Sequence, residues 1–227
     1  FQYIIFYVYI IMNNFLFPFS TCEKINKRGF IQQPYSAIIN GISAIIVLFF
    51  LLYTKLGPLF FLFLSIFVFQ IYHMFSHMVH INGNIQTNTI HIISYLVNFS
   101  LFYVLYEKSN QELKTLFLFL YIFLIILDLY AFFNLSTIYF IPTQVMLFLS
   151  LLVYYFKYLP NLLKNNLHNL IIIIFIIYGL VLNEKYNCKN MLEMFPNFPF
   201  HILIEIFGLL FFSFFSFTFY QENAYKE

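Results

Sequence analysis

Seven unbroken apolar segments of about 20 residues each dominate this sequence and restrict what it can fold into. They lie at residues 36–54, 58–79, 88–106, 114–133, 136–156, 167–183 and 200–220. A helix needs about 20 predominantly apolar residues to cross the hydrocarbon core of a bilayer. The segments do not alternate polar and apolar residues, as the strands of a membrane β-barrel do. The sequence therefore predicts an all-α polytopic membrane protein, a bundle of seven transmembrane helices.

The composition agrees with a lipid environment for most of the chain. Apolar residues make up 62% of the 227 residues and charged residues 9%, against about 45–50% and about 25% in soluble globular proteins. A soluble chain of this length could not bury that much apolar surface in its own core. The net charge of +2 offers no basic patch for a nucleic acid. We therefore expect an integral, multi-pass membrane protein in contact with membrane lipid.

The positions of the spans divide the chain into three regions. Residues 1–34 form an N-terminal segment with a polar loop, residues 35–220 hold the seven spans as one domain, and residues 221–227 form a polar tail. The apolar run at residues 1–12 is short for a span and follows no basic residues. An interfacial helix and the end of a signal anchor both remain open for it.

Polar residues concentrate on one side of the predicted bundle. We call the side that holds residues 20–34 face A and the opposite side face B. Asp128 lies in the face A half of the fourth span, and Glu205 opens the seventh span on face A. Five histidines also lie at face A ends of spans: His73, His77, His80, His91 and His201. Ionisable groups in a bilayer are costly and usually face the bundle interior, where they pair or bind ions. This distribution predicts a polar, His-lined cavity at face A.

Face A also holds both cysteines of the chain, Cys22 and Cys188. They could form a disulfide if face A lies in an oxidising compartment.

Lys and Arg are divided almost evenly between the two faces, so the positive-inside rule gives only a weak preference for face B as the cytosolic side. The charged residues from Glu23 to Arg28 are expected to form a solvated loop.

The spacing of the polar residues matches helical faces. Positions i, i+3, i+4 and i+7 share one face of the second span and hold His73, Ser76, His77 and His80. His201 and Glu205 stand at i and i+4, the geometry by which a helix presents two ligands to one metal ion. Histidine with carboxylate and without thiolate suits zinc in an open catalytic site. Two simpler interpretations also remain: the histidines hydrogen-bond lipid headgroups, and Asp128 hydrogen-bonds a neighbouring helix.

Three short segments are similar to those of a known group of membrane proteins. They are Cys22-Glu23 with the polar residues from Gln33 to Ser43, Ser76-x-x-x-His80, and Pro199-Phe200-His201-x-x-x-Glu205. Together with the number of spans, they resemble the CREST superfamily of seven-span membrane proteins, which includes the alkaline ceramidases and the progesterone and adiponectin receptors. The resemblance implies a zinc ion held by His80, His201 and Glu205, although the family has histidine at the position of Glu205. The acidic segment that binds calcium in ceramidases is reduced to Glu23, so no calcium site is expected.

The same residues lead to a prediction of function. Ser76, one turn before His80, would hydrogen-bond a developing oxyanion. His77 or His91 would move protons, and Asp128 completes the predicted catalytic residues. The sequence therefore predicts a zinc-dependent intramembrane hydrolase of a lipid amide or ester. The alternative is a non-enzymatic membrane protein, receptor-like or a structural subunit of a larger membrane complex, in which the histidines are interfacial or structural.

Overall fold

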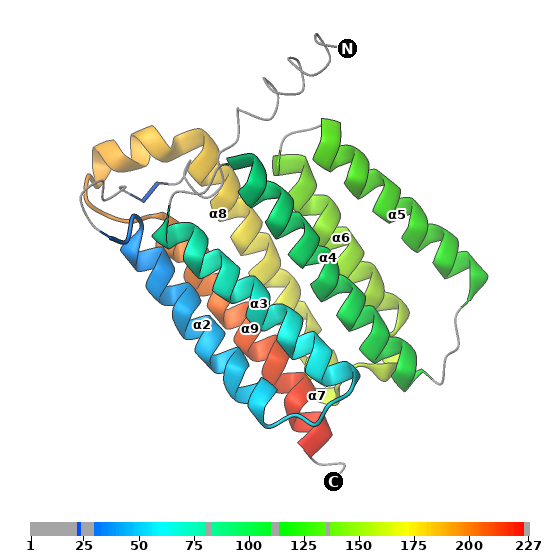
Figure 1. Ribbon diagram of the computed structural model, residues 1–227. Helices are drawn as coiled ribbons and strands as arrows, with labels where there is room; N and C mark the ends of the chain where they lie inside the picture. Colours follow the sequence, from blue (N-terminus) through cyan, green and yellow to red (C-terminus); the bar gives the residue numbers. More distant parts are fainter. Residues whose placement is uncertain (1–21, 24–29, 80–82, 110–113, 135–136, 225–227) are drawn as a thin grey trace.

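The computed structural model describes residues 22–23, 30–79, 83–109, 114–134 and 137–224, and within these ranges its regular elements are helices (Figure 1). The long ones are α2 (Pro34–Leu52), α3 (Pro58–Met78), α4 (Gly83–Lys108), α5 (Thr115–Asn134), α6 (Thr137–Tyr154), α8 (Leu167–Met194) and α9 (His201–Ala224). Two short elements, η1 (Phe156–Tyr158) and α7 (Asn161–Asn165), connect α6 to α8.

Six of these helices are long and apolar enough to cross a membrane: α2, α3, α4, α5, α8 and α9. The fifth predicted span corresponds to α6, an apolar helix of 18 residues whose fully described part is Ile141–Tyr154. Large apolar side chains cover the outer surface of the bundle, and Phe119 and Phe133 are 69% and 65% exposed. In water this surface would be unfavourable, whereas lipid solvates it. The structure thus supports an integral multi-pass membrane protein, and a seventh span remains a prediction.

The helices pack so that sequence-distant segments share one bundle. Helix α2 contacts α3 and α9, α3 contacts α4, α5 contacts α6, and α8 contacts α9 (Figure 1). The face B half of the bundle is filled by a buried apolar cluster that includes Leu62, Phe63, Leu105, Leu151 and Phe219. The buried ionisable side chains lie instead toward the face A half. Packing of the face B half therefore holds the helices in register, while the face A half carries polar groups.

Helix α2 begins with a cap supplied from outside the helix. Pro34 occupies the first turn, where its missing N–H is not needed. The carboxylate of Glu23 accepts hydrogen bonds from the backbone N–H of Tyr35, at 3.0 Å, and from the hydroxyl of Ser36. The expectation that Glu23 belongs to a solvated loop was wrong: its exposed fraction is 4%, because it satisfies donors at the start of a helix that have no partner inside it.

Helix α8 extends beyond its predicted span. The sequence placed the end of the sixth span at residue 183, but the helix continues to Met194. This end is polar and lies across the face A end of the bundle rather than along it (Figure 1). Cys188 on this end forms a disulfide with Cys22, with Cα atoms 5.6 Å apart, so the pairing that the topology allowed is present. The backbone N–H of Cys22 also donates to the carboxylate of Glu184.

Candidate metal centre

Helices α3 and α9 bring three imidazoles to one carboxylate. The Oε1 atom of Glu205 lies 2.8 Å from Nε2 of His201, 3.2 Å from Nε2 of His77 and 3.8 Å from Nε2 of His73. His73 and His77 are one turn apart on α3, and His201 and Glu205 are one turn apart on α9. The i, i+4 spacing places each pair on a single helix face, so the contact between the two faces creates the cluster.

Three of the four side chains of the cluster are held by residues outside it. His201 Nδ1 lies 2.8 Å from Oε2 of Glu184 on α8, and His77 Nδ1 lies 2.7 Å from Oε1 of Gln33. Asn40 on α2 donates its Nδ2 hydrogen to the second carboxylate oxygen of Glu205 at 2.8 Å. Partners of this kind fix the orientation of a ring and decide which of its nitrogens carries hydrogen.

The hydrogen bonds of His77 leave two acceptors facing each other. Because Nδ1 of His77 donates to the Gln33 carbonyl, the neutral ring presents the lone pair of Nε2 to Oε1 of Glu205, 3.2 Å away. An imidazole lone pair and a carboxylate oxygen repel unless a proton or a cation lies between them. Both side chains are buried, at 0% and 4% exposure, which increases the electrostatic cost in the absence of such a charge.

The donor set fits a small divalent metal. One ligand atom from each of His73, His77 and Glu205 lies within 4.8 Å of the other two. Ligand atoms around a tetrahedral zinc ion, with bonds of 2.0–2.1 Å, are separated by about 3.3 Å. Small side-chain movements would therefore bring these three atoms onto one ion. Histidine and carboxylate ligands without thiolate are compatible with zinc and with other transition metals.

His201 has a different arrangement from the other two imidazoles. Its two nitrogens lie 2.8 Å from carboxylate oxygens of Glu184 and Glu205, respectively. Since carboxylates only accept hydrogen bonds, both contacts are satisfied when both nitrogens carry hydrogen. His201 is therefore suited to hold a proton beside the group of His73, His77 and Glu205.

The structure separates the site residues predicted from sequence into two groups. His77, His201 and Glu205 belong to the cluster described above, and His80 lies outside the described residues. Ser76 is buried in α3, where its hydroxyl donates to the carbonyl of His73 at 2.6 Å. His91 and Asp128 lie in a second buried cluster between α4, α5 and α6, with His91 Nε2 3.9 Å from Asp128 Oδ2.

Some members of the first cluster were not assigned to a site by the sequence analysis. His73 was placed on the correct helix face but received no role. Glu184 was missed because it follows the sixth apolar run and was assigned to a loop. Its position on the polar continuation of that helix, facing the start of α9, is known only from the structure.

Comparison with known proteins gives no family for this chain: no family model, curated protein or solved structure matches it. The geometry of the two clusters is therefore the basis for any statement about function.

Proposed function

We propose that this protein is a seven-span membrane metalloenzyme that hydrolyses an amide or ester bond of a lipid, with zinc held by His73, His77 and Glu205. The observation that carries the proposal is the buried pair of acceptors, His77 Nε2 and Glu205 Oε1, at 3.2 Å. Glu205 is a ligand both in this proposal and in the sequence prediction. His73 and His77 replace His80 as the histidine ligands from α3. His201, predicted as a ligand, becomes the proton-holding neighbour.

The chemistry of the proposed site divides between the metal and the protein. When bound, zinc would lower the pKa of a water molecule to about 7 and polarise the carbonyl of the substrate. His201 would hold a proton at Nε2 and transfer it to the leaving amine or alcohol. Glu184 would keep the ring of His201 in place through Nδ1, and Asn40 would hold the second oxygen of Glu205.

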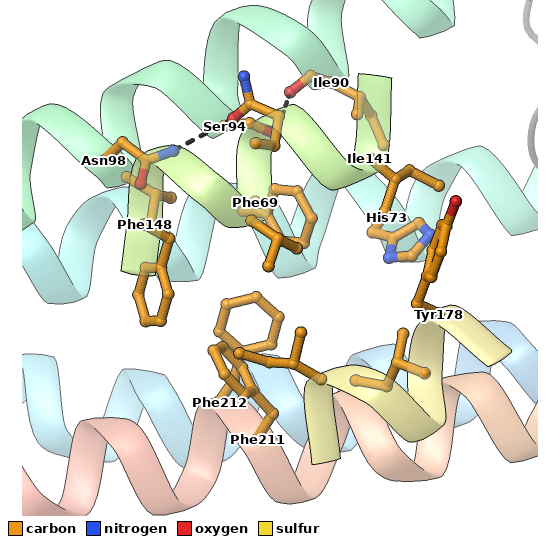
Figure 2. A pocket seen from close by; sticks show the side chains of 15 residues that line it. Phe69, His73, Ile90, Ser94, Asn98, Ile141, Phe148, Tyr178, Phe211 and Phe212 are labelled. Atoms are coloured by element: carbon orange, nitrogen blue, oxygen red, sulfur yellow. Dashed lines mark hydrogen bonds between the residues drawn. The ribbon is translucent and has the colours of Figure 1, made fainter. Parts of the chain in front are cut away.

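A lipid substrate is supported by the cavity beside the cluster. His73 lies in the wall of a cavity of about 300 Å³ whose lining is mostly apolar, including Phe69, Phe211 and Phe212 (Figure 2). Ligand pockets commonly have volumes of roughly 300–1,000 Å³. An apolar chain in this cavity would bring the polar end of the same molecule to the imidazole of His73.

The disulfide supports an orientation for the site. Disulfides persist in oxidising compartments, and Cys22 and Cys188 both lie at face A. We therefore place face A, with the metal centre, on the lumenal or extracellular side of the membrane and face B in the cytosol. The weak preference from the Lys and Arg distribution is for the same orientation.

The direct test is the metal content of purified protein. Elemental analysis of protein purified in detergent should find about one zinc per chain, and a chelator should abolish hydrolysis of a panel of lipid amides and esters. His168→Ala provides the control, because this histidine lies at the start of α8, away from face A, and should retain zinc. Protein that contains no zinc after purification and does not bind added zinc would refute the proposal.

Glu184 provides a test of the role of His201. Glu184→Gln should lower kcat by about tenfold to 100-fold while KM and zinc content are unchanged, because the ring that holds the proton loses its charged partner. Glu193→Gln is the matched control, since Glu193 lies on the same helix but its side chain is 66% exposed. A Glu184→Gln variant with native kcat would exclude this role.

A second candidate function rests on the polar contacts of the same cluster. Glu184, His201 and Glu205 form a continuous series that connects α8 to α9, and Asn40 extends it to α2. A non-enzymatic protein, receptor-like or a subunit of a membrane complex, would use this series to hold its helices together. Substitutions in the cluster would then lower thermal stability in protein that never bound metal.

A further inference from the structure

The cavity beside His73 has a second polar wall away from the metal centre. Five helices line it, α3, α4, α6, α8 and α9, and most of the lining is aliphatic or aromatic. Asn98 on α4 and Gln144 on α6 also contribute to the lining. In Figure 2 the labelled Asn98 and His73 lie at opposite ends of the cavity. A ligand that fills the cavity would therefore meet polar groups at two separate places.

The carbonyl oxygen of Asn98 is buried without a hydrogen-bond partner. The residue is 6% exposed, and in the described part of the chain no donor bonds to its Oδ1 atom. Its Nδ2 atom donates to Oε1 of Gln144 at 3.1 Å. Figure 2 shows the oxygen directed away from this bond, toward Phe148. Burying an amide oxygen without a donor is unfavourable. A ligand that donates a hydrogen bond to this oxygen would remove that cost.

The cluster around Asp128 fixes the orientation of this amide. Asp128 is fully buried and accepts hydrogen bonds from the hydroxyls of Tyr95 and Thr143. It also accepts from Nε2 of Gln144 at 2.7 Å. Since a carboxylate only accepts, Gln144 must turn its NH₂ group toward Asp128 and its carbonyl toward Asn98. Asn98 must then present NH₂ to Gln144, which leaves its own oxygen without a donor beside the cavity that the residue lines.

The depth of Asn98 restricts what can donate to it. Ten residues separate it from residue 88, where the third apolar segment of the sequence begins, which is about 15 Å of helix. That is close to the middle of a hydrocarbon core of about 30 Å. A buried water needs two to four polar partners. The nearby hydroxyl of Ser94 donates its hydrogen to the carbonyl of Ile90 at 2.8 Å. This hydrogen is therefore used within α4 and is not donated to a water molecule beside Asn98.

We propose that the cavity binds a lipid chain that carries a hydroxyl group along its length, and that Asn98 Oδ1 accepts the hydrogen bond of this hydroxyl. The apolar lining suits the chain, and the acceptor lies at a depth where a headgroup amide or amine would not reach. Asp128 and Gln144 act as positioning residues, because they hold the amide of Asn98 in the orientation that leaves its oxygen without a donor. The inference uses the cavity of the proposed function but concerns binding alone, so it holds whether or not the lipid is hydrolysed.

The test compares chains that differ only in the hydroxyl. Purified protein in detergent is titrated with stearic acid and with a series of stearic acids that carry one hydroxyl at successive chain positions. Hydroxylation near one position should strengthen binding by about fivefold to tenfold over stearic acid, and positions away from it should weaken binding. Repeating the titration after metal chelation separates this result from the proposed zinc chemistry.

Variants assign the preference to Asn98. Asn98→Leu should bind stearic acid at least as well as the native protein and lose the preference for the hydroxylated chain. Asp128→Asn should reduce the preference, because Gln144 can then reverse its amide and allow Asn98 to do the same. Ser94→Ala is the matched control in the same cavity wall and should keep the preference.

Two results would overturn the inference. In the first, the native protein binds every hydroxylated chain no more tightly than stearic acid. This measurement does not depend on the folding of any variant. The other is an Asn98→Leu variant that retains the native preference.

Discussion

Replacing Glu205 by alanine should leave the purified protein without stoichiometric zinc and without hydrolytic activity. Glu205 supplies the oxygen on which the three imidazoles converge, so its removal takes away both a ligand and the negative charge that offsets the metal. Loss of partners outside the ligand set already costs about tenfold to 100-fold in metal affinity or activity, and loss of a ligand should cost more. Zinc per chain and the rate of lipid hydrolysis, measured on the same preparation, check this prediction.

The variant Glu205→His distinguishes three roles for this residue. If Glu205 is a ligand, an imidazole at the same helical position should restore zinc and part of the activity. If Glu205 is instead a general base beside a His-only site, Glu205→His should keep zinc and lose turnover. If it is only a structural acid, both variants should lower thermal stability with no change in metal. Native zinc content and native rate in Glu205→Ala would eliminate the first two roles.

Removing the disulfide should cause the largest loss of stability among the substitutions considered. The bond joins residues 166 positions apart, and the loop-closure relation gives about 5 kcal/mol for a loop of that size. This value is an upper limit, because insertion in the membrane already restricts the unfolded chain. The double variant Cys22→Ser with Cys188→Ser should therefore unfold at a clearly lower temperature in detergent, and reductant should lower the Tm of the native protein in the same direction.

The control for the disulfide is Asn190→Ser, at an exposed position two residues along the same helix. It should leave the Tm unchanged with and without reductant. If the double cysteine variant has the Tm of the native protein, the bond does not hold the end of α8 and the N-terminal segment together.

Hydropathy predicted most of the fold because a membrane helix is recognised by its lipid-facing surface. The predicted spans correspond to helices in the structure, with six long enough to cross a membrane. Hydropathy failed at the end of α8, where the polar residues from Asn183 to Met194 continue the helix. Their sequence marks the end of lipid contact, whereas helix formation continues because backbone hydrogen bonds do not require an apolar environment.

The candidate site could be predicted only in part, for a geometric reason. The i, i+4 spacing placed His73 with His77 and His201 with Glu205 on single helix faces, and the structure has them there. Spacing along one helix does not decide which turn of that helix meets another helix, because the packing of α3 against α2 and α9 decides it. Asp128 illustrates the simpler interpretation, since its oxygens accept hydrogen bonds from residues of neighbouring helices.

The residues of the metal centre lie on helices that are synthesised at different times, so they enter the membrane in a fixed order. Helix α3 enters the bilayer with His73 and His77 long before α9 has been synthesised. Gln33, only 44 residues before His77, is already available, so the early helices can satisfy one of these imidazoles by themselves. Glu205 arrives with α9 and finds Asn40 and His77 in place. A nascent chain stalled before α9 would therefore hold His73 and His77 in the bilayer without the carboxylate that they contact in the folded protein.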